Sequence, residues 1–249
     1  MNIIPEMVAD WMGEQTIRSL PNYYRALKNA CEEFPPPFGE KYYGDIYRGV
    51  AGYPEWLASS LVVNAAGEGD GSTRLWELAS FTPNKFISDQ IKQHSIDEAR
   101  HARWYIAILD LTFPGSTNKE FHAQLETLSP GYTMTSPPTT DTSSPFAHAI
   151  TIDDLIQMNM AEIRTCVHHL LQRPILQIHC SPARHKKLIS LLDSLLADEI
   201  KHISYTARLI EDLSAKDCDI SVDELMKERL NDFNEITRND LDGQVFEST

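Results

Sequence analysis

The sequence predicts an all-α fold in which a four-helix bundle carries extra helices at its N-terminal and C-terminal ends. Apolar residues recur at helical spacing over several long segments, and no segment shows the alternation typical of a strand. The pattern Asp-Glu-x-basic-His occurs twice, at 97–101 and 198–202, and each copy lies inside a long helical segment. With 249 residues, 42% of them hydrophobic, the chain can bury a sizeable core, and we expect a single domain spanning residues 1–249.

The N-terminal part is expected to be helical over residues 5–33, with Pro21 dividing this extension into two segments. The proline run within 34–39 ends the pattern, because proline cannot continue a helix. Residues 40–53 are rich in tyrosine and glycine. We expect them to be irregular and to pack over the main bundle.

Four long helices should form the core of the bundle. The first has a proline in its first turn, which is a favoured start, and ends before Pro83. The third begins near Thr151 with two aspartates in its first turn, and we expect a kink at Pro174. The four core helices are expected at about 54–80, 85–112, 151–178 and 182–213.

A long connection, 114–150, joins the second core helix to the third. One helical stretch is expected in it, at about 119–128. Its centre, 129–145, is dense in Ser, Thr, Pro and Gly, which predicts a mobile loop or lid. A last helical piece is expected at 221–240. The core is thus organised as two helical hairpins joined by a crossover, which is one way to connect a four-helix bundle.

Each repeated motif places a carboxylate and an imidazole on one face of a helix. Glu98 and His101 are three residues apart, as are Glu199 and His202, so each pair can hold one transition-metal ion. Two such helices, each opposed by a further glutamate, make a carboxylate-bridged two-metal site in helical bundles. A single Glu-x-x-His means little, but two copies with a preceding Asp are rarely accidental.

The further glutamates follow from the geometry of a tight hairpin, in which residues equidistant from the turn lie side by side. Counting back from each motif through its turn reaches Glu68 opposite Glu98 and Glu162 opposite Glu199. Glu77 is the alternative on the first core helix. Its level differs from that of Glu98 by roughly 13 Å at ~1.5 Å of rise per residue, which is too far to share a metal.

All four glutamates lie on apolar stripes of their helices, where a bare carboxylate would be costly to desolvate and coordination to a cation removes that cost. Glu68 is flanked by Gly67, Gly69 and Gly71, and each glycine inside a helix costs up to ~1 kcal/mol relative to alanine. Either the first core helix breaks there, or a distorted turn leaves room for metal, dioxygen and substrate.

Asp97 and Asp198 each precede a motif glutamate and point sideways. We expect each to orient the histidine of the opposite motif, as carboxylates beside metal-bound histidines do. The alternative is an ion pair with Arg100 or Lys201. Further side chains on the same faces are expected to line a pocket: Tyr105, Cys166 and His169.

With these residues in place, the chain resembles the ferritin-like carboxylate-bridged diiron proteins, over roughly 55–112 and 151–213. The resemblance rests on the order Glu, Glu-x-x-His, Glu, Glu-x-x-His. It implies two iron ions, or manganese ions at the same ligands, held by Glu68, Glu98, His101, Glu162, Glu199 and His202.

His94 lies one turn before Glu98 and is a further candidate ligand. Diiron N-oxygenases carry an additional metal-binding histidine at that offset, but in the second motif, where this chain has Leu195. The alternative is that His94 hydrogen-bonds a ligand or packs in the core.

The resemblance implies a dioxygen-dependent diiron oxygenase or oxidase that oxidises a small organic molecule by hydroxylation, N-oxygenation or oxidative cleavage. Electrons would come from a ferredoxin-like or flavin reductase partner, or from the substrate. The alternative is a ferroxidase or iron-storage protein without an organic substrate. A large shell would identify the storage protein, whereas a monomer or homodimer is expected of the oxygenase.

Composition excludes several other classes. The net charge of −14 disfavours nucleic-acid binding, which needs clustered cations. The cysteines, Cys31, Cys166, Cys180 and Cys218, form no C-x-x-C pair, which disfavours a zinc ribbon or a disulfide scaffold. No apolar run approaches the ~20 residues of a membrane span, and no basic and apolar leader is seen. We therefore expect a cytoplasmic protein with no membrane partner.

Overall fold

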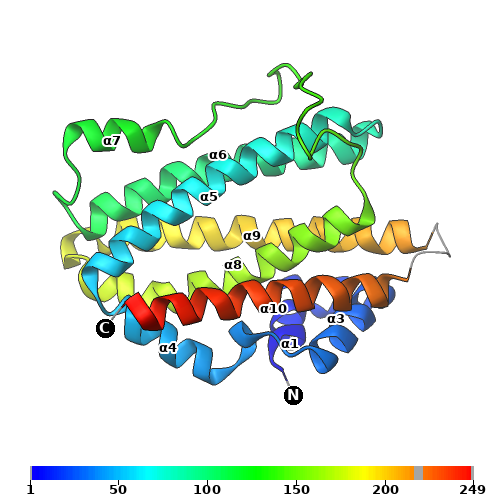
Figure 1. Ribbon diagram of the computed structural model, residues 1–249, viewed down its shortest axis with the longest axis horizontal. Helices are drawn as coiled ribbons and strands as arrows, with labels where there is room; N and C mark the ends of the chain where they lie inside the picture. Colours follow the sequence, from blue (N-terminus) through cyan, green and yellow to red (C-terminus); the bar gives the residue numbers. More distant parts are fainter. Residues whose placement is uncertain (1, 216–220, 248–249) are drawn as a thin grey trace. The chain divides into compact units, whose positions relative to one another are not determined.

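The computed structural model describes residues 2–215 and 221–247, and over this part of the chain it is 79% helical without any strand (Figure 1). The prediction of an all-α fold is confirmed. None of the described helices is long and apolar enough to cross a membrane. Cys218 lies outside the described residues. The principal helices, in chain order, are α1 (Ile4–Met12), α2 (Glu14–Arg18), α3 (Pro21–Glu33), α4 (Lys41–Ala51), α5 (Pro54–Phe81), α6 (Lys85–Thr112), α7 (Lys119–Glu126), α8 (Ile152–His179), α9 (His185–Ser214) and α10 (Val222–Glu247).

The long helices begin and end within a few residues of the predicted positions. At the start of α6, the Asn84 side chain accepts hydrogen bonds from the backbone N–H groups of Phe86 and Ile87, and so caps the helix. Helix α8 continues through Pro174. Within the N-terminal extension the sequence prediction missed one break, at Gly13, whose φ of 81° ends α1 before α2 begins.

The prediction of irregular structure at 40–53 was wrong, because residues Lys41–Ala51 form α4. Tyr43, Tyr47 and Val50 are buried and fall at helical spacing, so α4 has one apolar face. The packing of this face outweighs the low helix propensity of the two glycines within α4. Propensity is a weak guide where tertiary contacts decide.

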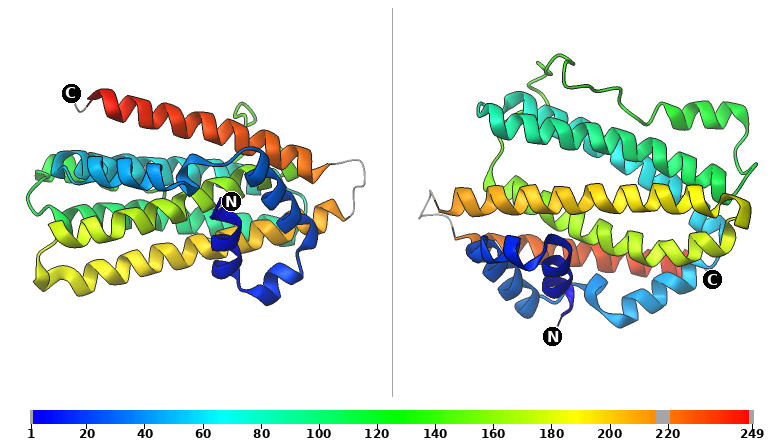
Figure 2. Two further views of the ribbon diagram at one scale, coloured as in Figure 1. Left: turned by 90° about the horizontal axis from the view of Figure 1, so that it is seen from below. Right: turned by 180° about the vertical axis from the view of Figure 1, so that it is seen from behind.

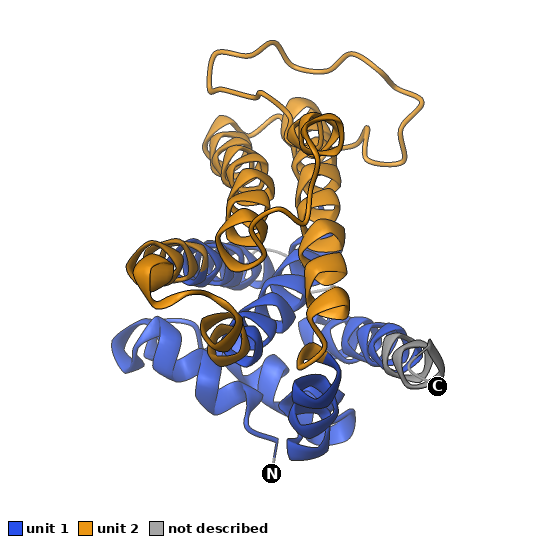
Figure 3. Cartoon of the chain, turned by 90° about the vertical axis from the view of Figure 1, so that its left-hand side faces the viewer, with its two compact units in different colours: residues 1–50, 151–172, 196–249 blue, residues 51–150, 173–195 orange. Residues whose placement is uncertain are grey.

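The chain divides into two compact units (Figure 3). Unit 1 contains residues 1–50, 151–172 and 196–249, and unit 2 contains residues 51–150 and 173–195. The boundaries fall within α8 and α9, so each of these helices contributes a segment to both units. One domain over 1–249 stays a prediction.

In unit 2, α5 and α6 form the predicted antiparallel hairpin. The Ser72 hydroxyl donates to the Ser95 carbonyl and the Ser95 hydroxyl donates to the Ser72 carbonyl, both at 2.7 Å. Nearer the turn, the Ser88 hydroxyl donates to the Ala79 carbonyl at 2.7 Å. Residues whose numbers sum to about 167 therefore face each other, which places Glu68 level with residues 98–99.

In unit 1, a buried polar network joins α3, α8 and α9. The Tyr23 hydroxyl donates to Asn159 Oδ1 at 2.8 Å. Asn159 Nδ2 donates to the Ile203 carbonyl at 3.1 Å and to Thr206 Oγ1 at 2.9 Å. Helix α10 packs along α3 in the same unit (Figure 2). The network fixes the register of α8 against α9 close to the second motif.

The connection between α6 and α8 lies in unit 2 and is fastened to α5 along its length. The Tyr132 ring stacks on Trp76 with ring centroids 4.6 Å apart, and the Trp76 indole N–H donates to the Pro137 carbonyl. The Ser144 hydroxyl donates to Glu77. The mobility expected of residues 129–145 stays a prediction. If this segment moves, its contacts with α5 must break.

Candidate metal centre

In unit 2, four candidate ligands lie on one hairpin, with Glu68 on α5 and His94, Glu98 and His101 on α6. His94 Nε2 lies 3.0 Å from Glu98 Oε1, and His101 Nδ1 lies 3.6 Å from the same oxygen. Glu98 is 5% exposed and the two histidines are 2% or less exposed, whereas Glu68 is only partly buried. One carboxylate oxygen therefore faces two imidazoles one turn to either side of it.

In unit 1, Glu162 lies on α8 and the second motif lies on α9. His202 Nδ1 lies 3.2 Å from Glu199 Oε2. His169, two turns beyond Glu162 on α8, places its Nε2 3.6 Å from Glu199 Oε1. Glu199 is fully buried. Both motifs thus turn Nδ1 of the histidine toward the glutamate of the same motif.

Seven of these side chains form two groups that could each hold a metal ion. His94, Glu98, Glu162 and His202 make up the first group, and Glu68, His101 and Glu199 the second. Six of the seven are the ligands expected from the repeated motif and the hairpin geometry. The seventh is His94, so the structure places this candidate among the possible donors. Carboxylate oxygens and imidazole nitrogens are the donors that divalent iron and manganese accept.

In unit 1 the carboxylates of Glu162 and Glu199 act on the buried thiol of Cys166. Burial raises the pKa of the Cys166 thiol, and the charges of Glu199 and Glu162 raise it further. Cys166 therefore stays a protonated thiol at neutral pH and is a poor candidate for a thiolate ligand or nucleophile. The same two negative charges, one of them on the fully buried Glu199, favour a bound cation.

The aspartates that precede the motif glutamates are buried and form ion pairs on their own helices. Arg100 lies 2.7 Å from Asp97, and Lys201 lies 2.8 Å from Asp198. These are the alternative partners foreseen from the sequence. That each aspartate also orients the histidine of the opposite motif stays a prediction.

The glycines around Glu68 do not break or unwind α5, which is helical throughout Pro54–Phe81, so that expectation was wrong. A Cβ atom at Gly69 would lie 1.9 Å from the Leu128 carbonyl oxygen, whereas at Gly67 and Gly71 it would meet nothing within 4 Å. Gly69 is required because the chain after α7 passes directly over α5. The contact lies one residue from Glu68 and ties that loop to the candidate ligand.

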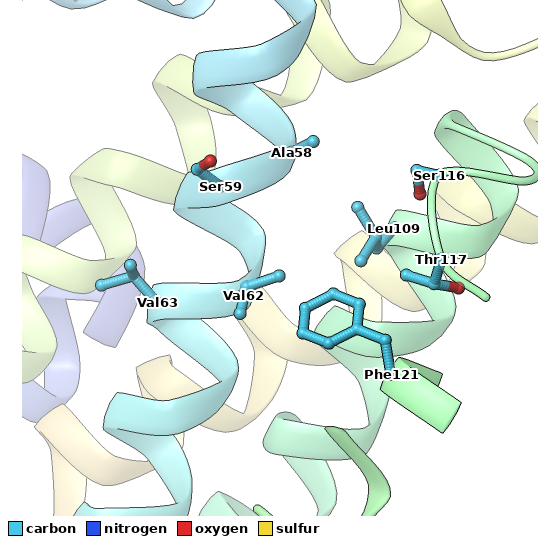
Figure 4. Close-up of a pocket in the computed structure, with 8 residues that line it drawn as sticks. All are labelled: Ala58, Ser59, Val62, Val63, Leu109, Ser116, Thr117 and Phe121. Carbon is cyan, nitrogen blue, oxygen red and sulfur yellow. The ribbon is translucent and has the colours of Figure 1, made fainter. Parts of the chain in front are cut away.

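A cavity of about 390 Å³ lies in unit 2 beside α5, between that helix and the start of α7 (Figure 4). Val62 of α5, Leu109 of α6 and Phe121 of α7 give it apolar walls. Val62 precedes Glu68 by six residues, or about 9 Å of helix rise. Tyr105, predicted to line a pocket, is buried on α6 one turn before Leu109.

Sequence reasoning missed Asn159, although it is fully buried and lies one turn before Glu162. The sequence signal that could have identified it is a polar amide side chain on the otherwise apolar face of α8. Sequence reasoning also missed the contact of His168, which the structure pairs with Tyr43.

Comparison of the chain with models of known protein families, with curated proteins and with solved structures gives no match. The class of the protein therefore rests on its own structure. It is a helical protein with a buried His/Glu cluster that is compatible with a two-metal site.

Proposed function

We propose that the chain is a non-haem diiron oxygenase or oxidase of the ferritin-like type, with a small organic molecule as substrate. The observation that carries the proposal is the doubling of one half-site: each unit contributes a Glu-x-x-His pair with Nδ1 turned toward the carboxylate, together with one further glutamate. A helical bundle with a purely structural role does not require even one such Glu-x-x-His pair, so two copies favour a metal site.

Charge balance supports two divalent ions. The four glutamates carry four negative charges, and two divalent cations neutralise them without any further group. Buried carboxylates left without a cation would have to bind protons or destabilise the fold. The donor set is made of oxygen and nitrogen, and the buried thiol nearby stays protonated, so iron or manganese fits better than a thiolate-held zinc or an iron–sulfur cluster.

When bound, an iron pair in this ligand set supplies the reduction and activation of dioxygen. The residues of the chain hold the ions, exclude water and position the substrate. The apolar stripes around Glu98 and Glu199 keep the centre dry, and the apolar cavity beside α5 suits the hydrocarbon part of a small substrate. A ferredoxin-like or flavin reductase would supply electrons to such a centre.

Anaerobic titration with iron(II), followed by dioxygen and optical spectroscopy, tests the proposal. We expect saturable uptake, then oxidation of the iron, and product formation once candidate substrates are added. Oxidation of iron with no organic product and elution as a large shell would favour the ferroxidase function instead. No uptake would reject both.

Matched variants make the uptake experiment specific. Glu162→Ala should lower iron loading because it removes a ligand, and Glu77→Ala should leave it unchanged. Glu77 is a suitable control because it lies on α5, as Glu68 does, and accepts a hydrogen bond from Ser144. Equal loading of the two variants would contradict the assignment of Glu162.

A further inference from the structure

Unit 1 contains a second cluster of titratable side chains, made of Tyr43 and Tyr47 on α4 and His168 and Gln172 on α8. The Tyr43 hydroxyl is hydrogen-bonded to His168 Nε2, and the two rings are nearly parallel, with an interplanar angle of 3°. The Tyr47 ring stacks against His168 with centroids 5.4 Å apart. Both tyrosines are 5% or less exposed.

His168 is a neutral hydrogen-bond acceptor for the Tyr43 hydroxyl. Desolvation lowers the pKa of His168 to about 3, and the charges of Arg164 and His169 lower it further in the same direction. The imidazole is therefore neutral at pH 7, and with Tyr43 as the donor its Nε2 carries the lone pair of this hydrogen bond. When such a phenol is oxidised by one electron it becomes a strong acid, and its proton can then pass to the imidazole within the hydrogen bond, without water.

Tyr47 differs from Tyr43 in its hydrogen-bond partner. It is buried and aromatic like its neighbour, and burial raises its pKa above the ordinary value. Its hydroxyl receives a hydrogen bond from the Gln172 amide, and an amide N–H cannot take up a proton. Tyr43, in contrast, is hydrogen-bonded to the imidazole of His168.

We infer that Tyr43 is a redox-active tyrosine, which gives one electron to the metal centre of the proposed function and passes its phenolic proton to His168. In this step the Tyr43 O–H bond breaks and an N–H bond forms at His168 Nε2. The oxidant is the centre after dioxygen has oxidised it, and that centre is reduced by one electron. The products are a neutral tyrosyl radical and an imidazolium, and one electron from an external reductant reverses the step.

The position of the cluster connects it to the second motif within unit 1. His168 is followed by His169, and His169 Nε2 lies 3.6 Å from Glu199. Next to Tyr43 in the sequence, Gly44 lines a cavity of about 500 Å³ together with the exposed Leu170. The role that follows is to remove surplus oxidising equivalents from the centre when no substrate is bound.

The redox site can be tested without any metal, so that its failure is separate from a failure of the proposed function. The full-length, metal-free protein is oxidised by one electron with a photo-excited ruthenium complex and an electron acceptor, then frozen for electron paramagnetic resonance. We expect a neutral tyrosyl radical that narrows when tyrosine is ring-deuterated. It should be lost in Tyr43→Phe, retained in the matched control Tyr47→Phe and weakened in His168→Gln.

Circular dichroism of each variant verifies its fold, and ring deuteration assigns the radical type in the unaltered chain. A radical that survives Tyr43→Phe, or that arises on tryptophan, overturns the inference.

The link to the centre is tested by adding iron(II) and then dioxygen, without substrate. The same radical is expected in the unaltered chain and in Tyr47→Phe, and not in Tyr43→Phe. Its absence in a protein that has taken up and oxidised iron overturns the coupling of Tyr43 to the centre. A protein that takes up no iron contradicts the proposed function, and with it the coupling, while the photo-oxidation result still decides whether Tyr43 is redox-active.

Discussion

Replacing Asn159 by alanine should destabilise the fold and loosen the second half-site together. Asn159 makes three hydrogen bonds in a fully buried position, to Tyr23 on α3 and to Ile203 and Thr206 on α9. It lies one turn before Glu162, and Thr206 Oγ1 donates in turn to the His202 carbonyl at 2.7 Å. The substitution therefore removes the polar connection that fixes Glu162 against the second motif.

The size of the destabilisation depends on whether each hydrogen-bond partner of Asn159 keeps another interaction. The Ile203 carbonyl and Thr206 retain other interactions on α9, but the Tyr23 hydroxyl loses its buried acceptor. The two hydrogen bonds to α9 at about 1 kcal/mol each, and the stranded Tyr23 donor at about 1–3 kcal/mol, give a loss of roughly 3–5 kcal/mol in the free energy of unfolding. Tyr23→Phe removes a single bond and should cost only about 1 kcal/mol.

A double-mutant cycle in chemical denaturation measures the coupling. Because Tyr23 is already stranded in Asn159→Ala, adding Tyr23→Phe there should be neutral or stabilising, in contrast to its cost in the unaltered chain. Asn234→Ala is the matched control. Asn234 is also fully buried in unit 1, but it donates a single bond, to the Phe34 carbonyl, so its loss should leave iron loading unchanged. An equal cost of Tyr23→Phe in both backgrounds would refute this reasoning.

Three further outcomes are expected. Gly69→Ala should lower stability by about 1–3 kcal/mol, because its Cβ would meet the Leu128 carbonyl, whereas Gly71→Ala should be neutral or stabilising by up to ~1 kcal/mol; denaturation midpoints that do not separate the two would contradict the close contact. His94→Ala should lower iron loading or change the optical spectrum if His94 is a ligand, and full loading with an unchanged spectrum would show that it only lies beside Glu98, with its Nε2 3.0 Å from Oε1. Limited proteolysis without substrate should cut first within 129–145, and early cleavage elsewhere would identify this segment as a fixed wall.

Patterns within single helices and tight hairpins could be predicted from the sequence. The register of α5 on α6 depends on a short turn, so counting back from Glu98 identified Glu68, and the bonds between Ser72 and Ser95 agree with that register. The spacing of Glu and His on one face is a property of the helix itself. These are local relations, and they carried the six expected ligands.

Contacts between distant segments could not be predicted in this way. Gly69 is explained by a carbonyl 59 residues further along the chain, and α4 is stabilised by the burial of Tyr43 and Tyr47, although its glycines suggested irregular structure. The pairing of Tyr43 with His168 joins residues 125 positions apart. Nothing in the local sequence specifies which of the many possible partners such a side chain meets.

The number of metal ions per chain tests the central claim most directly. The full-length protein is loaded with iron(II) under anaerobic conditions, freed of loosely bound metal and measured by elemental analysis against protein concentration. The six glutamate and histidine ligands should retain about two iron ions per chain. One ion or none would contradict the two-metal centre, and with it the proposed function.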